Sequence, residues 1–380
     1  MKSGHALFIC FCALVFVCTE PGTAQQKREM AEDVFKNVQL LKGIPVDEFM
    51  ETMGFFSASL GLNCVDCHTR QSEGNWAHYA DDTPLKQTAR RMIMMVDSIN
   101  KTNFGGARGV TCYSCHHGEQ RPKVIPSLVI QYSAPFEDPN EIEATGTRAP
   151  EADNIFSKYV QALGGADKLE KLTSFTAKGT YSGYDTDQQK FPVEIFAKRP
   201  AQRTTIVHMS IGGAVEDSVR TYDGRDGWIA SPDKPVPLMT LSGGILAGAR
   251  VEAMLPFPAV LKQAFSQWRA GSASIEDRDV EVLEATNTGQ PPVKLYFDST
   301  SGLLVRLVRY SDSPVGRNPT QVDYEDYRDV AGVKMPFRWT ATWTDGQTMT
   351  ELTEIQANIP IDASKFARPA PAPPPKPTVK

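Results

Sequence analysis

The spacing of apolar residues predicts two amphipathic helices in the first third of the chain. Between residues 45 and 60, apolar side chains recur at steps of three and four, and Gly61 follows as a stop signal. A second stripe covers residues 84–100, where Thr83 offers an N-cap ahead of a proline at the first helical position. Each stretch is therefore expected to bury one face.

The hydrophobic pattern changes after residue 153. A short helical region is expected at 154–172, and runs rich in β-branched and aromatic residues then recur between turn signals, as in antiparallel sheets. Residues 243–269 interrupt these runs with helix-like apolar spacing. The expected fold class is therefore α+β. The predicted strands cover residues 174–181, 193–198, 203–209, 218–222, 227–231, 293–298, 303–310, 322–328, 337–344 and 348–356.

Proline-rich stretches divide the chain into parts. Residues 123–153 carry several prolines among polar residues, so we expect a linker there. Residues 368–380 are rich in proline and alanine and predict a polyproline II or disordered tail. With 380 residues in total, the chain is expected to contain two domains, at residues 25–122 and 154–367.

The first 24 residues have the pattern of a cleavable secretory signal peptide. Lys2 precedes an apolar run at residues 6–17, and Gly22 and Ala24 suit the −3 and −1 positions of a cleavage site. The run is too short to span a bilayer, and no later apolar segment is long enough. We therefore expect a periplasmic or secreted protein with no transmembrane segment after cleavage.

The charge balance is mildly acidic, with a formal net charge of −5 and no basic run, so no nucleic-acid partner is expected. Three of the seven cysteines lie in the leader. The other four belong to two short motifs, and none remains for a structural disulfide.

Two Cys-x-x-Cys-His motifs, at residues 64–68 and 112–116, carry the candidate chemistry. This is the spacing at which two thiols on one helical turn form thioethers with a porphyrin, while the next imidazole binds the iron as proximal ligand. The motifs predict two c-type haems, attached through Cys64, Cys67, Cys112 and Cys115, with His68 and His116 as proximal ligands.

Paired cysteines leave two alternatives open. A zinc site of four cysteines needs no histidine after each pair, and the gap between Cys67 and Cys112 is longer than zinc ribbons usually have. A redox disulfide would need a thioredoxin-like strand and helix around it. The histidine that follows both pairs favours haem.

A methionine-bearing helix precedes each motif. Met50 and Met53 lie in the first predicted helix, and Met92, Met94 and Met95 lie in the second. A thioether sulfur is a common sixth ligand of haem iron and raises its reduction potential. Methionine at helical spacing is also common core filler, so the residues alone leave the choice of ligand open.

Residues 34–122 resemble the haem-binding repeats of the photosynthetic reaction-centre cytochrome c subunit family. The resemblance lies in the repeated helix, turn and motif, and in the stretches at residues 90–95 and 110–116. Subunits of that family carry four haems and are often lipid-anchored, whereas this chain has two motifs and no good lipobox. The resemblance therefore supports haem geometry and electron transfer without implying a photosynthetic role.

The same resemblance implies which methionines bind iron. In that family the axial ligand is the first member of a Met-x-x-Met pair on the helix. This points to Met50 and Met92, with Met53 and Met95 as alternatives.

Residues 154–368 resemble the half-barrel fold of the outer-membrane lipoprotein carriers. The similar pieces are turn and strand patterns at residues 159–165, 222–224, 297–306 and 324–328. The resemblance implies a curved antiparallel sheet with helices over its concave face, able to hold a lipid or another apolar ligand.

These observations predict an exported dihaem c-type cytochrome that exchanges single electrons with redox partner proteins. One alternative is a haem-containing sensor or an apolar-ligand-binding module in which the half-barrel is the functional part. Another is a haem enzyme with an open distal site. Hydrolase chemistry is not expected, since His208 is the only histidine of the second domain and no nucleophile motif accompanies it.

Overall fold

A computed structural model describes residues 28–372, apart from residues 74, 132, 134–137, 142–148, 212–213 and 233. The predicted signal peptide at residues 1–24 lies outside the described residues, and the predicted tail is described only to residue 372. None of the described helices combines the length and the apolar character needed to cross a membrane.

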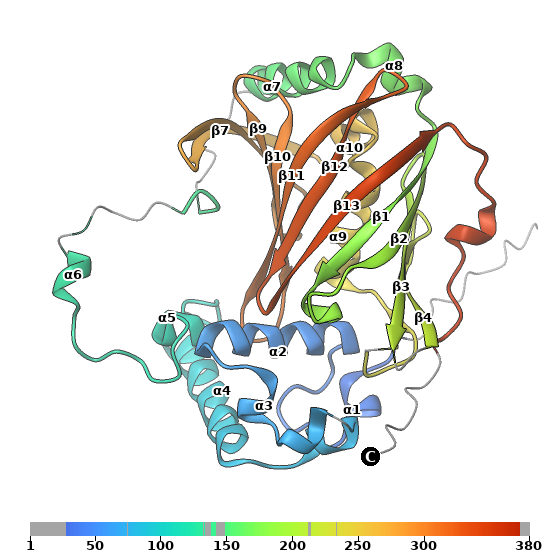
Figure 1. The fold of residues 1–380 in the computed structure, drawn as a ribbon. Coiled ribbons are helices and arrows are strands. Elements are labelled where there is room, and N and C mark those ends of the chain that lie inside the picture. Colours follow the sequence, from blue (N-terminus) through green and yellow to red (C-terminus); the bar gives the residue numbers. More distant parts are fainter. Residues whose placement is uncertain are drawn as a thin grey trace, which may run out of the picture.

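The N-terminal part of the protein is helical (Figure 1). Both predicted amphipathic helices are present, as α2 and α4. Gly61 ends α2 at a φ of 62°, and a side chain there would come within 2.2 Å of the Gly118 carbonyl oxygen, so only glycine fits. The elements are α1 (Ala31–Val34), α2 (Val46–Leu60), α3 (Cys64–Cys67), η1 (Arg70–Glu73), η2 (Trp76–Ala80), α4 (Pro84–Asn103), α5 (Cys112–His116) and α6 (Leu128–Gln131).

The strands of the described residues form one open antiparallel sheet of 13 strands. Its order is β6-β5-β4-β3-β2-β1-β13-β12-β11-β10-β9-β8-β7, so β1 pairs with β13 at the centre. The expected α+β class is confirmed. The strands are β1 (Ser174–Gly183), β2 (Phe191–Lys198), β3 (Gln202–Ile211), β4 (Ala214–Tyr222), β5 (Gly227–Ala230), β6 (Met239–Thr240), β7 (Gln267–Ile275), β8 (Arg278–Thr286), β9 (Val293–Asp298), β10 (Leu304–Asp312), β11 (Arg317–Val330), β12 (Val333–Trp343) and β13 (Gly346–Ala357).

Every predicted strand coincides with an observed one, but β6, β7 and β8 were not predicted. The β7 strand is a sheet edge that contains Gly271 and several small polar residues, which have low β-propensity. The turn from β7 to β8 is made by Glu276 and Asp277 at positive φ values of 49° and 63°, where glycine or asparagine is the usual signal.

Helices cover the curved sheet. The α7 helix (Ala149–Ala162) lies across one end, and α9 (Gly243–Met254) and α10 (Pro258–Gln263) pack on one face (Figure 1). Phe156 and Tyr159 of α7 join Met254 of α9 and Phe297 of β9 in the main hydrophobic core. The remaining elements are α8 (Ala166–Lys171), η3 (Tyr184–Thr186) and η4 (Ala363–Phe366).

The helical part packs against one end of the sheet. The α2 helix lies across the end of the sheet opposite α7 (Figure 1). Its Asp47 carboxylate is 1% exposed and accepts hydrogen bonds from the backbone N–H and the hydroxyl of Ser242. The ring of Phe55 packs so closely on Gly316 that a side chain at residue 316 would overlap it. The predicted domain boundaries stay predictions, but the two parts share a close interface.

Candidate functional site

A capped single helical turn presents the first cysteine pair. The Asn63 side chain accepts hydrogen bonds from the N–H groups of Val65 and Asp66, both at 3.1 Å. In return the Asp66 carboxylate accepts from the Asn63 N–H at 2.8 Å. This capping box stabilises α3, which carries Cys64 and Cys67 three positions apart on one helical turn.

His68 follows α3 and is oriented by a backbone carbonyl. Its Nδ1 lies 3.1 Å from the Tyr79 carbonyl oxygen, which leaves Nε2 available to a metal when Nδ1 carries the proton. Burial, together with the nearby Lys86 ammonium, lowers the pKa of His68. Both effects favour the neutral imidazole, which is the metal-binding form.

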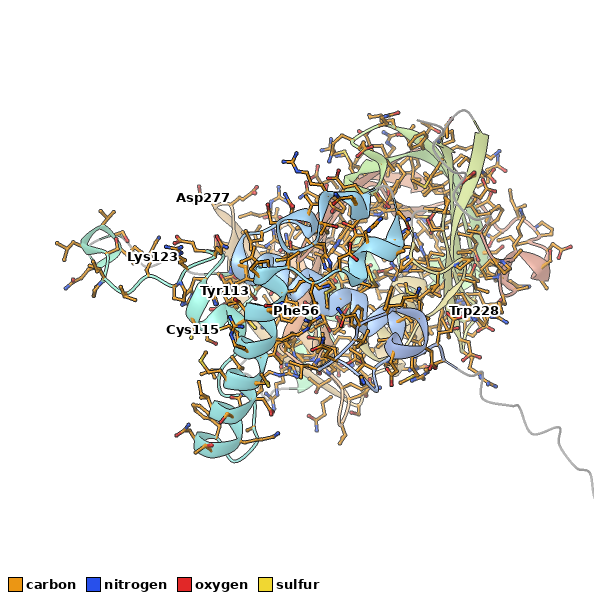
Figure 2. The ribbon with its side chains drawn as sticks, turned by 90° about the horizontal axis from the view of Figure 1, so that it is seen from below. Phe56, Tyr113, Cys115, Lys123, Trp228 and Asp277 are labelled. Atoms are coloured by element: carbon orange, nitrogen blue, oxygen red, sulfur yellow. The ribbon has the colours of Figure 1, made fainter. Side chains whose placement is uncertain are left out.

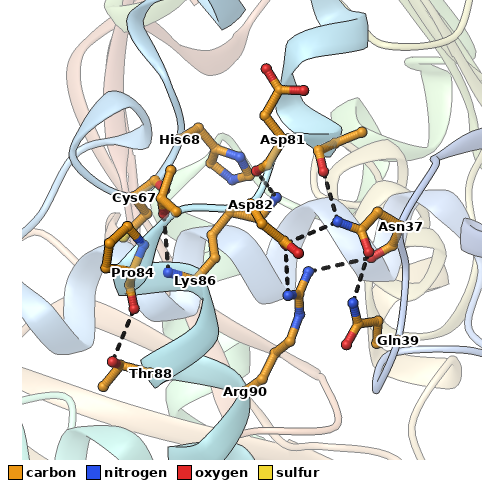
Figure 3. A network of polar contacts seen from close by, with 12 residues as sticks. Asn37, Gln39, Cys67, His68, Asp81, Asp82, Pro84, Lys86, Thr88 and Arg90 are labelled. Carbon is orange, nitrogen blue, oxygen red and sulfur yellow. Dashed lines mark hydrogen bonds and ion pairs between the residues drawn. The ribbon is translucent and has the colours of Figure 1, made fainter.

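The loop that supplies this carbonyl is held by a polar network (Figure 3). Asn37 donates to the Ala80 carbonyl at 2.7 Å and to the Asp82 carboxylate at 2.9 Å. Arg90 of α4 also donates to Asp82 at 2.7 Å, and the Lys86 ammonium donates to the Tyr79 carbonyl at 2.9 Å. The position of His68 therefore depends on α4 and on the residues before α2.

Thr83 links α4 directly to the first motif, which allows a test. Its hydroxyl donates to the Cys67 carbonyl at 2.6 Å and accepts from the Lys86 N–H as the N-cap of α4. We expect Thr83→Ala to lower the free energy of unfolding by about 1 kcal/mol, as measured by denaturant titration. Thr88→Ala is the matched control, because the Thr88 hydroxyl bonds only within α4. An equal loss in both variants would show that Thr83 has no special role.

The second motif repeats this construction. Thr111 and Ser114 form a capping box around α5, and the His116 Nδ1 lies 3.0 Å from the Glu119 carbonyl oxygen. Asn100 of α4 accepts hydrogen bonds at 3.0 Å from two backbone N–H groups of the preceding loop. Both motif histidines thus direct Nδ1 to a backbone carbonyl and keep Nε2 free for a metal.

The described residues fit a covalently held porphyrin. All four motif cysteines are free thiols. The 20-residue α4 helix has an apolar stripe but no buried residue, so a large apolar surface lacks cover among the described residues. No three His, Cys, Asp or Glu side chains in the described ranges cluster as a site for a bare metal ion. A macrocycle beside α4 would cover its stripe and supply core to this small segment.

The methionines occupy different surroundings. Met50 lines a cavity together with Cys64, whereas Met53 packs in a small cluster that contains Cys112. Met92 and Met95 on α4 are 36% and 45% exposed. Met50 also packs in a cluster with Val46 and Met239, and what it shares with Cys64 is the lining of one large cavity.

The second motif is partly exposed. Cys112 is buried in a cluster with Phe55 of α2, whereas Cys115 is exposed and Tyr113 is 52% exposed. In Figure 2 Tyr113 and Cys115 lie toward the side of the molecule from which α4 and α6 project. In the first motif, Cys64 is exposed and Cys67 is half-buried.

A cavity of ≈ 690 Å³ adjoins the first motif. Cys64, Met50 and Tyr79 line one end of it, and it continues along the sheet, where alternate residues of β3 point inward. The intervening His208 lies on the other face and hydrogen-bonds Asp217 at 2.7 Å, away from the cavity. The volume is within the range of about 300–1,000 Å³ that is typical of small-molecule sites.

The aromatic surroundings of the first motif were not predicted from the sequence. Trp76 and Tyr79 stack with ring centroids 4.8 Å apart, and His78 between them hydrogen-bonds Asp81 at 2.9 Å. Tyr184, from η3 of the sheet part, interacts with the Cys64 thiol, and burial with this neighbour raises the pKa of Tyr184 to about 12. The aromatic residues after the motif were a usable signal for η2. Tyr184 is so distant in sequence that no local pattern could reveal it.

Known proteins match the helical part of the chain. Residues 12–167 match the family model of the photosynthetic reaction centre cytochrome C subunit. The chain is 36% identical over 105 residues to the photosynthetic reaction center cytochrome c subunit of Roseobacter denitrificans, covering 26% of this chain and 28% of that one. It is 39% identical over 97 residues to the corresponding subunit of Thermochromatium tepidum, covering 24% and 23%. The first resemblance is confirmed, and the chain spans about a quarter of the length of these relatives.

Solved structures match the sheet part. A LolA superfamily protein from Nitrosomonas europaea aligns with a TM-score of 0.38 at 15% identity, covering 57% of this chain and 97% of that chain. A DUF1329 family protein from Desulfovibrio piger aligns with a TM-score of 0.39 at 10% identity, again covering 57% and 97%. LolA-type proteins are therefore among the structural neighbours, in line with the second resemblance.

Proposed function

We propose that this protein is an exported dihaem c-type cytochrome that passes single electrons between redox partner proteins. The observation that carries the proposal is the repeated unit of a capped turn, two thiols and an imidazole whose Nδ1 is bound to a carbonyl. Similarity to cytochrome c subunits over the same residues supports it. Bound haem would supply a metal that changes its charge by one electron.

The chain's own residues would hold and tune that group. Cys64, Cys67, Cys112 and Cys115 would form the thioethers, and His68 and His116 would bind iron through Nε2. We propose Met50 and Met92 as distal ligands, with Met53 and Met95 as alternatives. The shared cavity of Met50 and Cys64 supports the first of these assignments, and the exposed position of Met92 leaves it free to meet a porphyrin beside α4.

Carbon monoxide binding to the reduced protein tests the distal ligands. We expect the wild-type protein to have low-spin haems that do not bind carbon monoxide, since a histidine and a methionine would hold each iron. Met50→Ala and Met92→Ala should each leave one iron without its methionine ligand. Each variant should then bind about one carbon monoxide per protein and have a lower reduction potential. Met53→Ala and Met95→Ala are matched controls that should keep the wild-type spectrum. Carbon monoxide binding in the controls instead would move the assignment to those residues, and binding in the wild type would favour a catalytic or sensing haem.

A second candidate function is the binding of an apolar ligand by the sheet part. The cavity favours it, because apolar side chains of β2, β3, β12 and β13 line most of its length. Binding of 1-dodecanol to the haem-loaded protein, measured by calorimetry, tests this function. Absence of binding would leave the cavity as part of the first haem site alone.

A further inference from the structure

A cluster of charged residues lies within the cavity. Arg203 of β3, Arg220 of β4 and Arg309 of β10 all line it, as does Glu252 of α9. Arg309 donates to the Glu252 carboxylate at 3.0 Å, and Arg220 lies 3.8 Å from the same oxygen. Three strands and a helix therefore direct three guanidinium groups toward one carboxylate.

Carboxylates face this cluster of positive charge. Glu252 interacts with all three arginines, Glu51 of α2 interacts with Arg220 and Arg309, and Asp47 lies next to Glu51 in the cavity lining. Arginine stays protonated in proteins, so the cluster keeps three positive charges beside these carboxylates.

The hydrogen-bonding capacity of the cluster is incomplete. Among the described residues, none accepts a hydrogen bond from the Arg203 guanidinium, whose charged neighbours are Glu252 and Arg220. The Nη2 of Arg220 and the Nε of Arg309 are buried without a hydrogen-bond partner. Buried guanidinium N–H groups without acceptors are costly, so a ligand that brings acceptor oxygens would be stabilised there.

We infer that the cavity binds an amphiphile with a single carboxylate. Arg203 and Arg220 would bind the carboxylate, and the hydrocarbon chain of the ligand would lie along the apolar wall. That wall is formed by alternate inward residues, among them Ile195, Val207 and Leu352. A carboxylate brings acceptor oxygens to the unpaired N–H groups of the cluster and matches the planar fork of a guanidinium. The inference rests on the ligand-binding function proposed above and is independent of the haem assignment.

A pair of ligands that differ only in the head group tests the inference. Dodecanoate and 1-dodecanol are titrated into the haem-loaded full chain by calorimetry. We expect dodecanoate to bind about 10- to 100-fold more tightly than 1-dodecanol, since hydrogen bonds to charged groups contribute about 1.5–3 kcal/mol. Arg203→Gln should weaken dodecanoate binding by a similar factor and leave 1-dodecanol binding unchanged, which also checks that the cavity has folded.

Arg338→Gln is the matched control. Arg338 is half-exposed and pairs with Glu325, so this variant should bind dodecanoate as the wild type does. Equal binding of the two ligands, or no change in Arg203→Gln, would overturn the inference. A change of haem potential in Arg203→Gln with unchanged dodecanoate binding would also overturn it, because the guanidinium would then serve a haem propionate. Binding of neither ligand would refute the ligand-binding function itself.

Discussion

Alanine at both Cys112 and Cys115 should reduce the haem content from two per protein to one. Thioethers form only at cysteine, and the two motifs are capped separately, by Asn63 with Asp66 and by Thr111 with Ser114. Loss of one motif should therefore leave the haem at the other motif attached. Intact-protein mass spectrometry and a haemochrome assay on the purified protein measure the stoichiometry.

The reciprocal pair and a control complete this experiment. Cys64→Ala with Cys67→Ala should leave one haem, at the second motif. Tyr113→Ala lies between the two cysteines of the second motif and is exposed, so it should keep both haems. Two haems in either double-cysteine variant would refute covalent attachment at that motif.

Loss of the second haem should also unfold α4. That helix has no buried residue among the described ranges, so we expect its polar contacts alone to be too weak to keep it folded without a macrocycle over its apolar stripe. The α2 helix should stay folded, since Asp47 and Phe55 are buried against the sheet part. Hydrogen exchange should therefore be fast along α4 and slow along α2. Protected α4 amides in the variant lacking Cys112 and Cys115 would contradict the idea that the macrocycle completes the core.

The helices and most strands could be predicted because their signals are local. The apolar periodicity predicts both helices, Gly61 marks the end of α2, and Thr83 marks the start of α4. The β7 and β8 strands were missed because β7 is an edge strand of small residues and its turn uses acidic residues at positive φ. At such positions tertiary pairing outweighs local propensity.

The candidate site likewise has features that the sequence predicts and features that depend on the fold. The two motifs can be identified from adjacent residues, but the carbonyl partners of His68 and His116 depend on how the following loops turn back. The contact of Asp47 with Ser242 joins residues 195 positions apart, and no local pattern could reveal it. The arginine cluster is likewise assembled from distant strands, so it could be recognised only from the fold.

Replacing Glu252 by glutamine should strongly destabilise the sheet part. The variant removes the carboxylate that faces all three guanidinium groups and leaves Glu51 to offset part of their mutual repulsion. Removing one partner of a buried ion pair typically costs 3–5 kcal/mol, and since 24% of the Glu252 side chain is exposed we expect about 3 kcal/mol near neutral pH. Denaturant titration of the haem-loaded protein measures it. Glu281→Gln is the control, because Glu281 pairs with Lys158 at the surface and should cost less than about 1 kcal/mol.

The pH dependence of this loss identifies its electrostatic origin. Burial alone would raise the pKa of Glu252, but Arg220, Arg309 and Arg203 outweigh it and lower the pKa to about 2. A folded-state pKa below the unfolded value of 4.5 means that the contribution is complete above pH 4.5 and is lost as the pH falls toward 2. The difference in unfolding free energy between wild type and Glu252→Gln should therefore shrink between these two pH values. A difference that stays constant over this range would mean that glutamine disturbs packing instead, and that the three arginines do not depend on the negative charge of Glu252.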